Sequence, residues 1–92
     1  MKNDFEYVFD PLKNAKLKEE RGVNFEDVIM AIEQGRLLDV RPHHNPDKYS
    51  TQDILVVEIN GYIYLVPCIQ RQDLLIFKTV YPSRRATKFY LN

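Results

Sequence analysis

The chain has 92 residues, 45% of them hydrophobic and 28% charged, and its thirteen basic and thirteen acidic side chains give zero net charge. This composition is typical of a soluble globular chain and excludes a disordered tail, a fibre and a coiled coil. A chain of this length buries about 60–65% of its unfolded surface, which is enough for one core and one domain, residues 1–92. No apolar run approaches the roughly 18 residues that span a bilayer, and the acidic, aromatic start is not a secretory signal. We therefore expect a cytoplasmic protein with no membrane partner.

The first predicted elements are a strand and a helix. Phe5, Tyr7 and Phe9 alternate with polar or smaller residues, which predicts a half-buried strand over residues 5–9. Asp10 and Pro11 end the strand and favour a helix start, because aspartate caps helices and proline suits the first helical position. This helix runs to about Glu20 and is mostly exposed, with a left-handed glycine at position 22.

A second, more apolar helix follows. Asn24 is a good N-cap, and Asp27 stands where a capping box needs its return hydrogen bond. The apolar side chains that share one face are Phe25, Val28, Ile29 and Ile32. Gly35 ends the helix, and we expect the apolar face to lie on a sheet.

The second half of the chain predicts strands. Residues 37–40 form a short strand, and residues 41–53 form a polar loop long enough to suggest a functional role. Residues 54–59 and 62–66 form a hairpin, because Asn60-Gly61 is a strong signal for a tight turn with positive φ. A third strand covers residues 74–81. Pro82 then breaks the strand and Ser83 caps a last helix over residues 84–90, with packing positions at Ala86, Phe89 and Tyr90.

The predicted element order is β-α-α-β-β-β-β-α, an α+β fold. We expect two N-terminal helices, an antiparallel sheet of about four to five strands and a short C-terminal helix. The strands over residues 54–59, 62–66 and 74–80 are expected to be consecutive neighbours under the second helix.

Several kinds of site are not expected. His43 and His44 match no zinc-ligand spacing, and two solvated loop histidines are the simpler interpretation, although either is a candidate for proton transfer in a nucleic-acid site. Cys68 stands alone, which excludes an internal disulfide and favours a buried hydrophobe over a nucleophile. The three glycines all lie at turns, so no glycine-rich phosphate loop is present. We expect no metal ion and no cofactor.

The charges are distributed unevenly along the chain. Residues 1–33 carry five basic and eight acidic side chains, whereas residues 68–92 carry five basic side chains and one acidic one. Arg84 and Arg85 open the last helix, where free amides already favour anions, and their guanidinium groups suit bidentate phosphate binding. Lys78, Lys88 and the nearby tyrosines suggest phosphate contacts and base stacking. A solvated basic face is the alternative, and for Phe89 we expect packing onto the sheet.

Three segments resemble one family in the same order. They are Phe9-Asp10-Pro11-Leu12-Lys13-Asn14, Glu20-Arg21-Gly22-Val23-Asn24-Phe25-Glu26-Asp27-Val28 and Phe77-Lys78-Thr79-Val80-Tyr81-Pro82-Ser83-Arg84-Arg85-Ala86-Thr87. They are similar to "W/F-D-P-x-K-x", "K-H-G-V/I-S-F-E-E-A" and "I-R-I-I-S-A-R-x-A-T" of the BrnT family of bacterial toxins. The chain departs from this pattern at Lys78, where the family has arginine, and at Tyr81-Pro82, where it has Ser-Ala.

The resemblance implies a RelE-like fold and a metal-independent ribonuclease toxin of a type II toxin–antitoxin system. It implies messenger RNA as substrate and a DNA-binding antitoxin as partner, in a dimer or a toxin–antitoxin hetero-oligomer. By position it assigns catalysis to Arg84, Arg85 and Lys78, to which we add Tyr81. The side chains expected to bind nucleic acid are Lys88, Tyr90, His43 and His44.

Two non-catalytic functions remain open from the sequence. The basic face could cover an acidic protein target, as ParE-like relatives of the same fold do. Alternatively, the domain only engages a partner, which would add a strand to residues 54–59 or 62–66 if these lie at a sheet edge.

Overall fold

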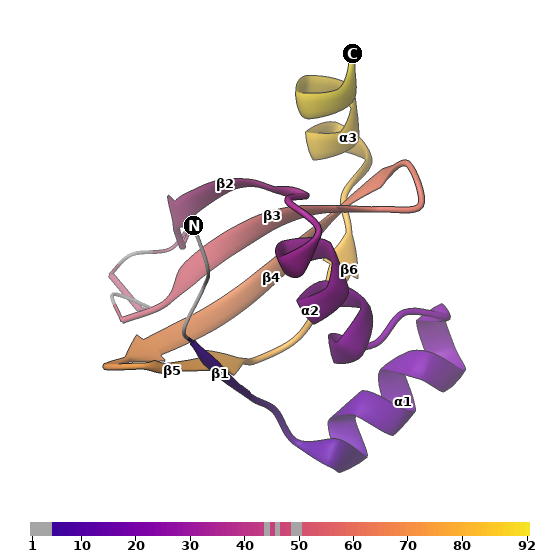
Figure 1. Ribbon diagram of the computed structural model, residues 1–92. Coiled ribbons are helices and arrows are strands. Elements are labelled where there is room, and N and C mark those ends of the chain that lie inside the picture. Colours follow the sequence, from indigo (N-terminus) through magenta and orange to yellow (C-terminus); the bar gives the residue numbers. More distant parts are fainter. Residues whose placement is uncertain (1–4, 44, 46, 49–50) are drawn as a thin grey trace.

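A computed structural model describes residues 5–43, 45, 47–48 and 51–92 (Figure 1). These residues form an α+β fold of three helices and six strands in the order β1-α1-α2-β2-β3-β4-β5-β6-α3. The bounds are β1 Glu6–Val8, α1 Pro11–Arg21, α2 Phe25–Glu33, β2 Leu37–Pro42, β3 Asp53–Ile59, β4 Tyr62–Arg71, β5 Leu74–Phe77, β6 Tyr81–Pro82 and α3 Arg84–Leu91. Within these residues, no helix is long and apolar enough to cross a membrane.

The strands form one mixed sheet in the order β1-β5-β4-β3-β2, with β6 also paired to β4. Strands β3, β4 and β5 are consecutive antiparallel neighbours, which confirms the predicted arrangement. The expectation of a purely antiparallel sheet was wrong, because β1 pairs with β5 in parallel. Helices α1 and α2 carry the chain from this edge to β2 at the other edge (Figure 1). The parallel strands β1 and β5 are joined by the whole segment from α1 to β4, because a hairpin cannot connect parallel strands.

The strand predicted over residues 74–81 is interrupted. β5 ends at Phe77, and β6 then resumes the pairing with β4, with Tyr81 opposite Leu65 and Pro82 opposite Tyr64. The pairing register shifts by one residue between these strands, as in a β-bulge. Val80 lies in this interval, is fully buried, and its carbonyl accepts a 2.7 Å hydrogen bond from Arg21 at the end of α1. The one-residue register shift beside Val80 is what divides the predicted strand into β5 and β6.

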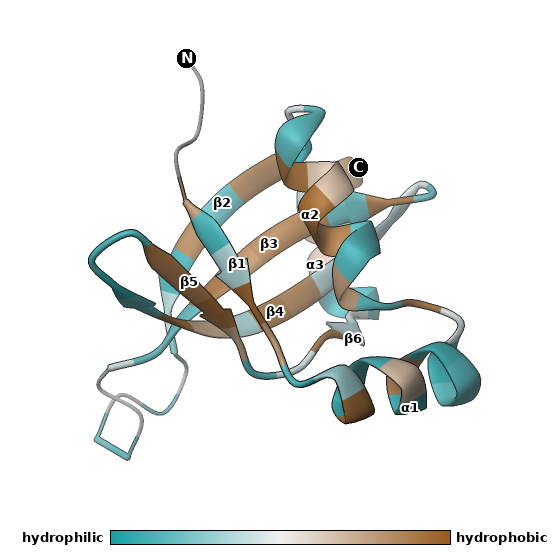
Figure 2. Ribbon diagram, turned by 60° about the horizontal axis from the view of Figure 1, so that its bottom comes forward, coloured by the Kyte–Doolittle hydropathy of each residue, from teal (hydrophilic) through white to brown (hydrophobic). Residues whose placement is uncertain are grey.

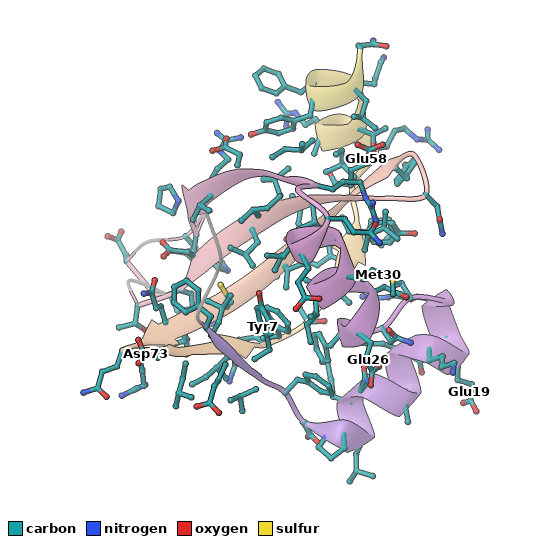
Figure 3. All side chains as sticks on the ribbon, in the orientation of Figure 1. Tyr7, Glu19, Glu26, Met30, Glu58 and Asp73 are labelled. Carbon is teal, nitrogen blue, oxygen red and sulfur yellow. The ribbon has the colours of Figure 1, made fainter. Side chains whose placement is uncertain are left out.

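Both N-terminal helices begin and end as predicted. Asp10 caps α1 and Gly22 ends it with φ of 69°. Asn24 and Asp27 form the complete capping box of α2. The helices are also joined through Asn14, whose side-chain oxygen accepts from the Phe25 amide at 2.7 Å and whose side-chain nitrogen donates to Glu26 at 2.8 Å. Glu26 lies between α2 and α1 in Figure 3.

The main core lies between α2 and one face of the sheet. Phe25 and Val28 of α2 are fully buried and Ile29 and Ile32 are partly buried against the same core, which confirms the predicted packing face. Ala31, which was not predicted, is also fully buried. The sheet residues beneath them are apolar and come from the three central strands: Leu55, Val57, Ile59, Val66, Cys68, Leu75 and Phe77. Figure 2 shows these strands as hydrophobic and α1 as largely hydrophilic, as expected for an exposed helix.

The opposite face of the sheet is also apolar and is only partly covered. Ile54, Val56 and Ile63 are buried on this face, which carries α3 at one end. Because β3 is buried on both faces, its sequence is a continuous apolar run rather than an alternating one. The expectation that Phe89 packs onto the sheet was wrong, since its side chain is 76% exposed. The uncovered part of this face, beside α3, is where the candidate site lies.

Candidate nucleic-acid interface

Helix α3 is attached to the sheet mainly through polar contacts at its first turn. Ser83 caps the helix by accepting from the Ala86 amide at 3.0 Å, and the Ser83 amide donates to the Ile63 carbonyl at 2.9 Å. The Thr87 hydroxyl accepts from the Ile63 amide at 2.9 Å and donates to the Ser83 carbonyl at 2.7 Å. No residue of α3 is fully buried. The backbone groups of Ile63 on β4 thus bond to Ser83 and Thr87 where a neighbouring strand would otherwise pair. These bonds fix the position of the first turn of α3.

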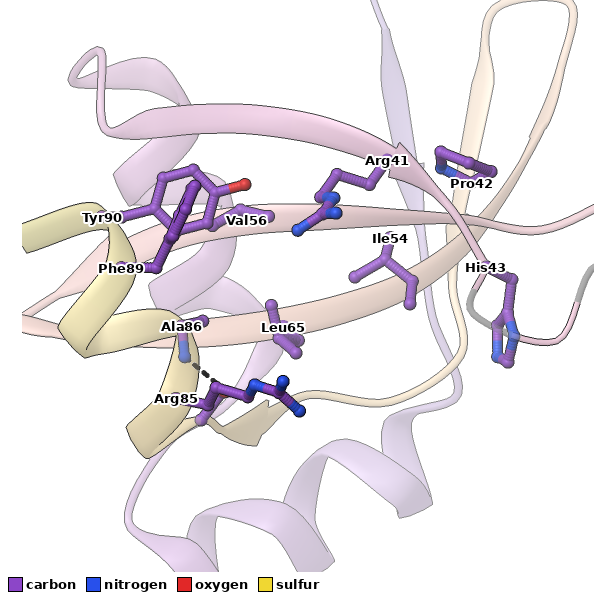
Figure 4. A pocket seen from close by; sticks show the side chains of 11 residues that line it. Arg41, Pro42, His43, Ile54, Val56, Leu65, Arg85, Ala86, Phe89 and Tyr90 are labelled. Carbon is purple, nitrogen blue, oxygen red and sulfur yellow. Dashed lines mark hydrogen bonds between the residues drawn. The ribbon is translucent and has the colours of Figure 1, made fainter.

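A groove of about 580 Å³ lies between this helix and β2 (Figure 4). Its floor is apolar and is formed by Ile54 and Val56 of β3 and Leu65 of β4. One wall is the end of β2 and the following residue, with Arg41, Pro42 and His43; the other is α3 with its N-cap, with Ser83, Arg85, Ala86, Phe89 and Tyr90. Two arginines and two aromatic rings therefore surround an apolar surface.

The structure brings three of the predicted site residues together in this groove: Arg85, Tyr90 and His43. Four others do not line it, namely Arg84, Lys88, Lys78 and Tyr81. Arg84 and Lys88 are exposed on α3, and Lys78 is exposed in the interval between β5 and β6. Tyr81 is half-buried on β6 opposite Leu65, beside the floor. His44 lies outside the described residues.

Arg41 is the groove residue that the sequence analysis missed. Residues 41–53 were expected to be a loop, but β2 continues to Pro42. Side chains point alternately to the two faces along a strand, so Asp39 and Arg41 lie on the same face of the sheet. Asp39 pairs with Val56 and Arg41 pairs with Ile54, the two floor residues of β3. The alternation Asp39-x-Arg41-x-His43 was visible in the sequence, and reading it as a strand would have placed Arg41 in the site.

Tyr90 and Asp39 join the two walls of the groove. The Tyr90 hydroxyl donates to the Asp39 carboxylate at 2.6 Å, and the other carboxylate oxygen of Asp39 accepts from the Val40 amide at 2.8 Å. The Tyr90 hydrogen bond is the main reason that the pKa of Asp39 is lowered, and the same bond raises the pKa of Tyr90. Tyr90 therefore stays protonated and acts as a donor or a stacking surface rather than as a base.

The imidazole of His43 is 9% exposed at the end of β2. Its Nδ1 atom accepts from the Asn45 amide at 3.1 Å, and its own amide donates to the Gln52 carbonyl at 3.2 Å. A neutral imidazole that accepts at Nδ1 carries its proton on Nε2. The expectation of a solvated loop histidine was wrong, because this side chain is held in the wall of the groove.

Phe89 and Tyr90 place aromatic surface at the groove. Their ring centroids are 4.9 Å apart with an interplanar angle of 79°, so one ring supports the other edge-on. Because Phe89 is exposed, its ring face is accessible to a ligand. An exposed phenylalanine supported in this way is a suitable stacking surface for an unpaired base.

Cys68 lies on the other face of the sheet, away from the groove. It is 1% exposed, and burial raises the pKa of its thiol to about 12. The thiolate needed for nucleophilic attack is therefore not formed near neutral pH. Across the described part of the chain, no three histidine, cysteine or acidic side chains gather as metal ligands.

No protein-family description, no curated protein and no solved structure matches this chain.

The Thr87 hydroxyl is expected to stabilise the fold around the groove. Thr87→Val leaves the Ile63 amide without its acceptor, which should reduce the free energy of unfolding by about 1–3 kcal/mol. Thr87→Ser keeps the hydroxyl and should lose less than about 1 kcal/mol. Urea unfolding followed by circular dichroism measures both. A larger loss in Thr87→Ser than in Thr87→Val would show that the methyl group, and not the hydrogen bond, holds α3.

Proposed function

We propose that this protein is a ribonuclease toxin of a type II toxin–antitoxin system, a divergent BrnT-like protein with a RelE-like fold. The observation that carries the proposal is the groove itself: guanidinium groups, an exposed ring and a histidine around an apolar floor. Guanidinium groups bind phosphodiesters and aromatic rings stack on unpaired bases, so this combination suits single-stranded RNA. The resemblance of three ordered segments to BrnT toxins supports the same function. Such a toxin acts in the cytoplasm.

The proposed chemistry is attack of a ribose 2′-hydroxyl on the adjacent phosphorus. The bond from the 2′ oxygen to phosphorus forms and the bond to the 5′ oxygen breaks. The hydroxyl proton passes to a base, and the departing oxygen takes up a proton. The products are a 2′,3′-cyclic phosphate and a 5′-hydroxyl end. Negative charge grows on the phosphoryl oxygens during attack, so preorganised cations lower the barrier without a metal ion.

The groove favours particular roles for its residues. Arg85 stabilises the developing charge, because it lines the groove while Arg84 does not. His43 is the proton-transfer group, because a histidine can take up and give back a proton near neutral pH. Phe89 and Tyr90 hold a base. Lys78, Arg84 and Lys88 contact phosphates outside the groove, and Tyr81 supports the floor beside Leu65.

The expected partner is a DNA-binding antitoxin that covers the groove. The alternative of strand addition at residues 54–59 or 62–66 has no support, because β3 and β4 are paired on both sides and lie in the interior of the sheet. A protein target in place of RNA remains the runner-up and is separated from the main proposal by the experiment below.

The test is induced expression in a bacterial host, with growth and total RNA followed together. We expect growth arrest with RNA fragments that carry 5′-hydroxyl and 2′,3′-cyclic phosphate ends. The Arg84→Ala/Arg85→Ala double variant should relieve both effects while accumulating as folded protein. Arrest with intact RNA would contradict the ribonuclease proposal and favour a protein target. Absence of arrest with folded wild-type protein would contradict a toxin altogether.

A further inference from the structure

The groove has a second arginine, on the wall opposite Arg85. Arg41 is an exposed residue of β2 and is the direct partner of Ile54 in the β2–β3 pairing. Figure 4 shows the Arg41 and Arg85 side chains extending from opposite walls, with the floor residues between them. A strand and a helix that are distant in sequence thus each contribute one guanidinium to the same space.

The carboxylate of Asp39, the acidic residue next to Arg41 on the same face of β2, already has hydrogen-bond partners. Both carboxylate oxygens of Asp39 accept hydrogen bonds, one from the Tyr90 hydroxyl and one from the Val40 amide. Among the influences that lower the pKa of Asp39, the Tyr90 bond is the largest and the charge of Arg41 is the smallest. The carboxylate is therefore directed mainly at Tyr90. Arg41 also interacts with the Tyr90 hydroxyl, which lowers the pKa of Tyr90 a little against the larger effect of Asp39. A guanidinium has five N–H donors, so one such contact leaves Arg41 donors for a ligand.

The Asp39–Tyr90 bond also fixes the spacing of the walls. The first turn of α3 is held by Ser83 and Thr87, whereas its last turn has exposed Phe89 and Leu91 and no fully buried residue. Tyr90 connects this last turn to β2 over 51 residues of sequence. Arg41 lies two residues from Asp39 on the same face of β2, so the bond that positions the helix also sets its distance from Arg41.

We propose that Arg41 is a second phosphate-binding residue of the groove and that, together with Arg85, it holds the sugar–phosphate backbone of a single strand between β2 and α3. This inference rests on the proposed function, because it takes the ligand to be RNA. Each guanidinium offers a planar set of donors to phosphate oxygens. The strand then runs along the groove with a base against Phe89.

The test is the salt dependence of binding to a short 2′-O-methyl oligoribonucleotide, which cannot be cleaved because its 2′ oxygens are blocked. Each phosphate contact on a single strand contributes about 0.7 to the slope of log K against log salt. Arg41→Ala should lower the slope by about 0.7 and weaken binding at low salt about tenfold. Arg41→Lys, which keeps the charge, should restore most of the slope. A residue that only shaped the groove would weaken binding without changing the slope.

Arg71→Ala is the matched control. Arg71 is an exposed arginine at the β4–β5 turn, six residues along β4 from the floor residue Leu65, or roughly 20 Å. Arg71→Ala should leave both the salt slope and the binding affinity unchanged. If Arg41→Ala also leaves the slope unchanged while Arg85→Ala lowers it, the Arg41 inference is wrong and the proposed function stands. If the wild-type protein neither binds the oligonucleotide nor cuts unmodified RNA, the proposed function itself fails.

Discussion

Arg85→Ala is expected to slow RNA cleavage by about 10²–10³-fold, which corresponds to about 3–4 kcal/mol of transition-state stabilisation. The side chain is exposed on the second residue of α3 and lines the groove opposite Arg41. Its removal therefore takes away charge at the reacting phosphate without opening a cavity in the core. Single-turnover cleavage of a labelled RNA by purified protein measures the loss, and the unfolding midpoint should stay the same.

Arg84→Ala is the paired comparison, because Arg84 is the preceding residue of the same helix, carries the same charge and does not line the groove. It should slow cleavage by less than about tenfold. The comparison is informative because the family resemblance alone does not distinguish the two arginines. If Arg84→Ala gave the larger loss, the reaction would take place on the outer face of α3 and not in the groove.

Phe25→Ala is expected to have the largest effect on stability, a loss of about 3–5 kcal/mol in the free energy of unfolding. The Phe25 side chain is fully buried, and its ring centroid lies 5.1 Å from that of Phe9 and 5.6 Å from that of Phe77. It thus joins α2 to both the start of α1 and the sheet. Single domains have only about 5–15 kcal/mol in total, so a large part of the chain should be unfolded.

Urea unfolding, or the refolding yield if the variant is insoluble, measures this effect. Leu12→Ala is a control on α1, because Leu12 is 81% exposed and its truncation should change stability by less than about 0.5 kcal/mol. A loss below about 1 kcal/mol for Phe25→Ala would contradict the aromatic core between α2 and β5. Together the Phe25 and Arg85 variants separate loss of the fold from loss of the site.

The local features of this chain were predictable because each depends on residues close in sequence. The caps at Asp10 and Asn24 satisfy amides of their own helices, and the turn at Asn60-Gly61 needs two residues with positive φ, observed at 53° and 76°. The apolar face of α2 follows from its helical spacing. Arg85, Tyr90 and His43 were identified as candidates because their chemistry suits RNA wherever they lie.

The tertiary structure alone decided which of these residues meet. The strand at residues 6–8 has the same pattern whether its partner is parallel or antiparallel, and only the long-range pairing placed it beside β5 in parallel. Phe89 is apolar like a core residue, but the position of α3 beside the groove leaves its side chain 76% exposed. Arg41 belongs to the groove because the β2–β3 register sets it beside Ile54. Short-range hydrogen bonds and spacing therefore determined the elements, whereas long-range pairing and packing determined the site.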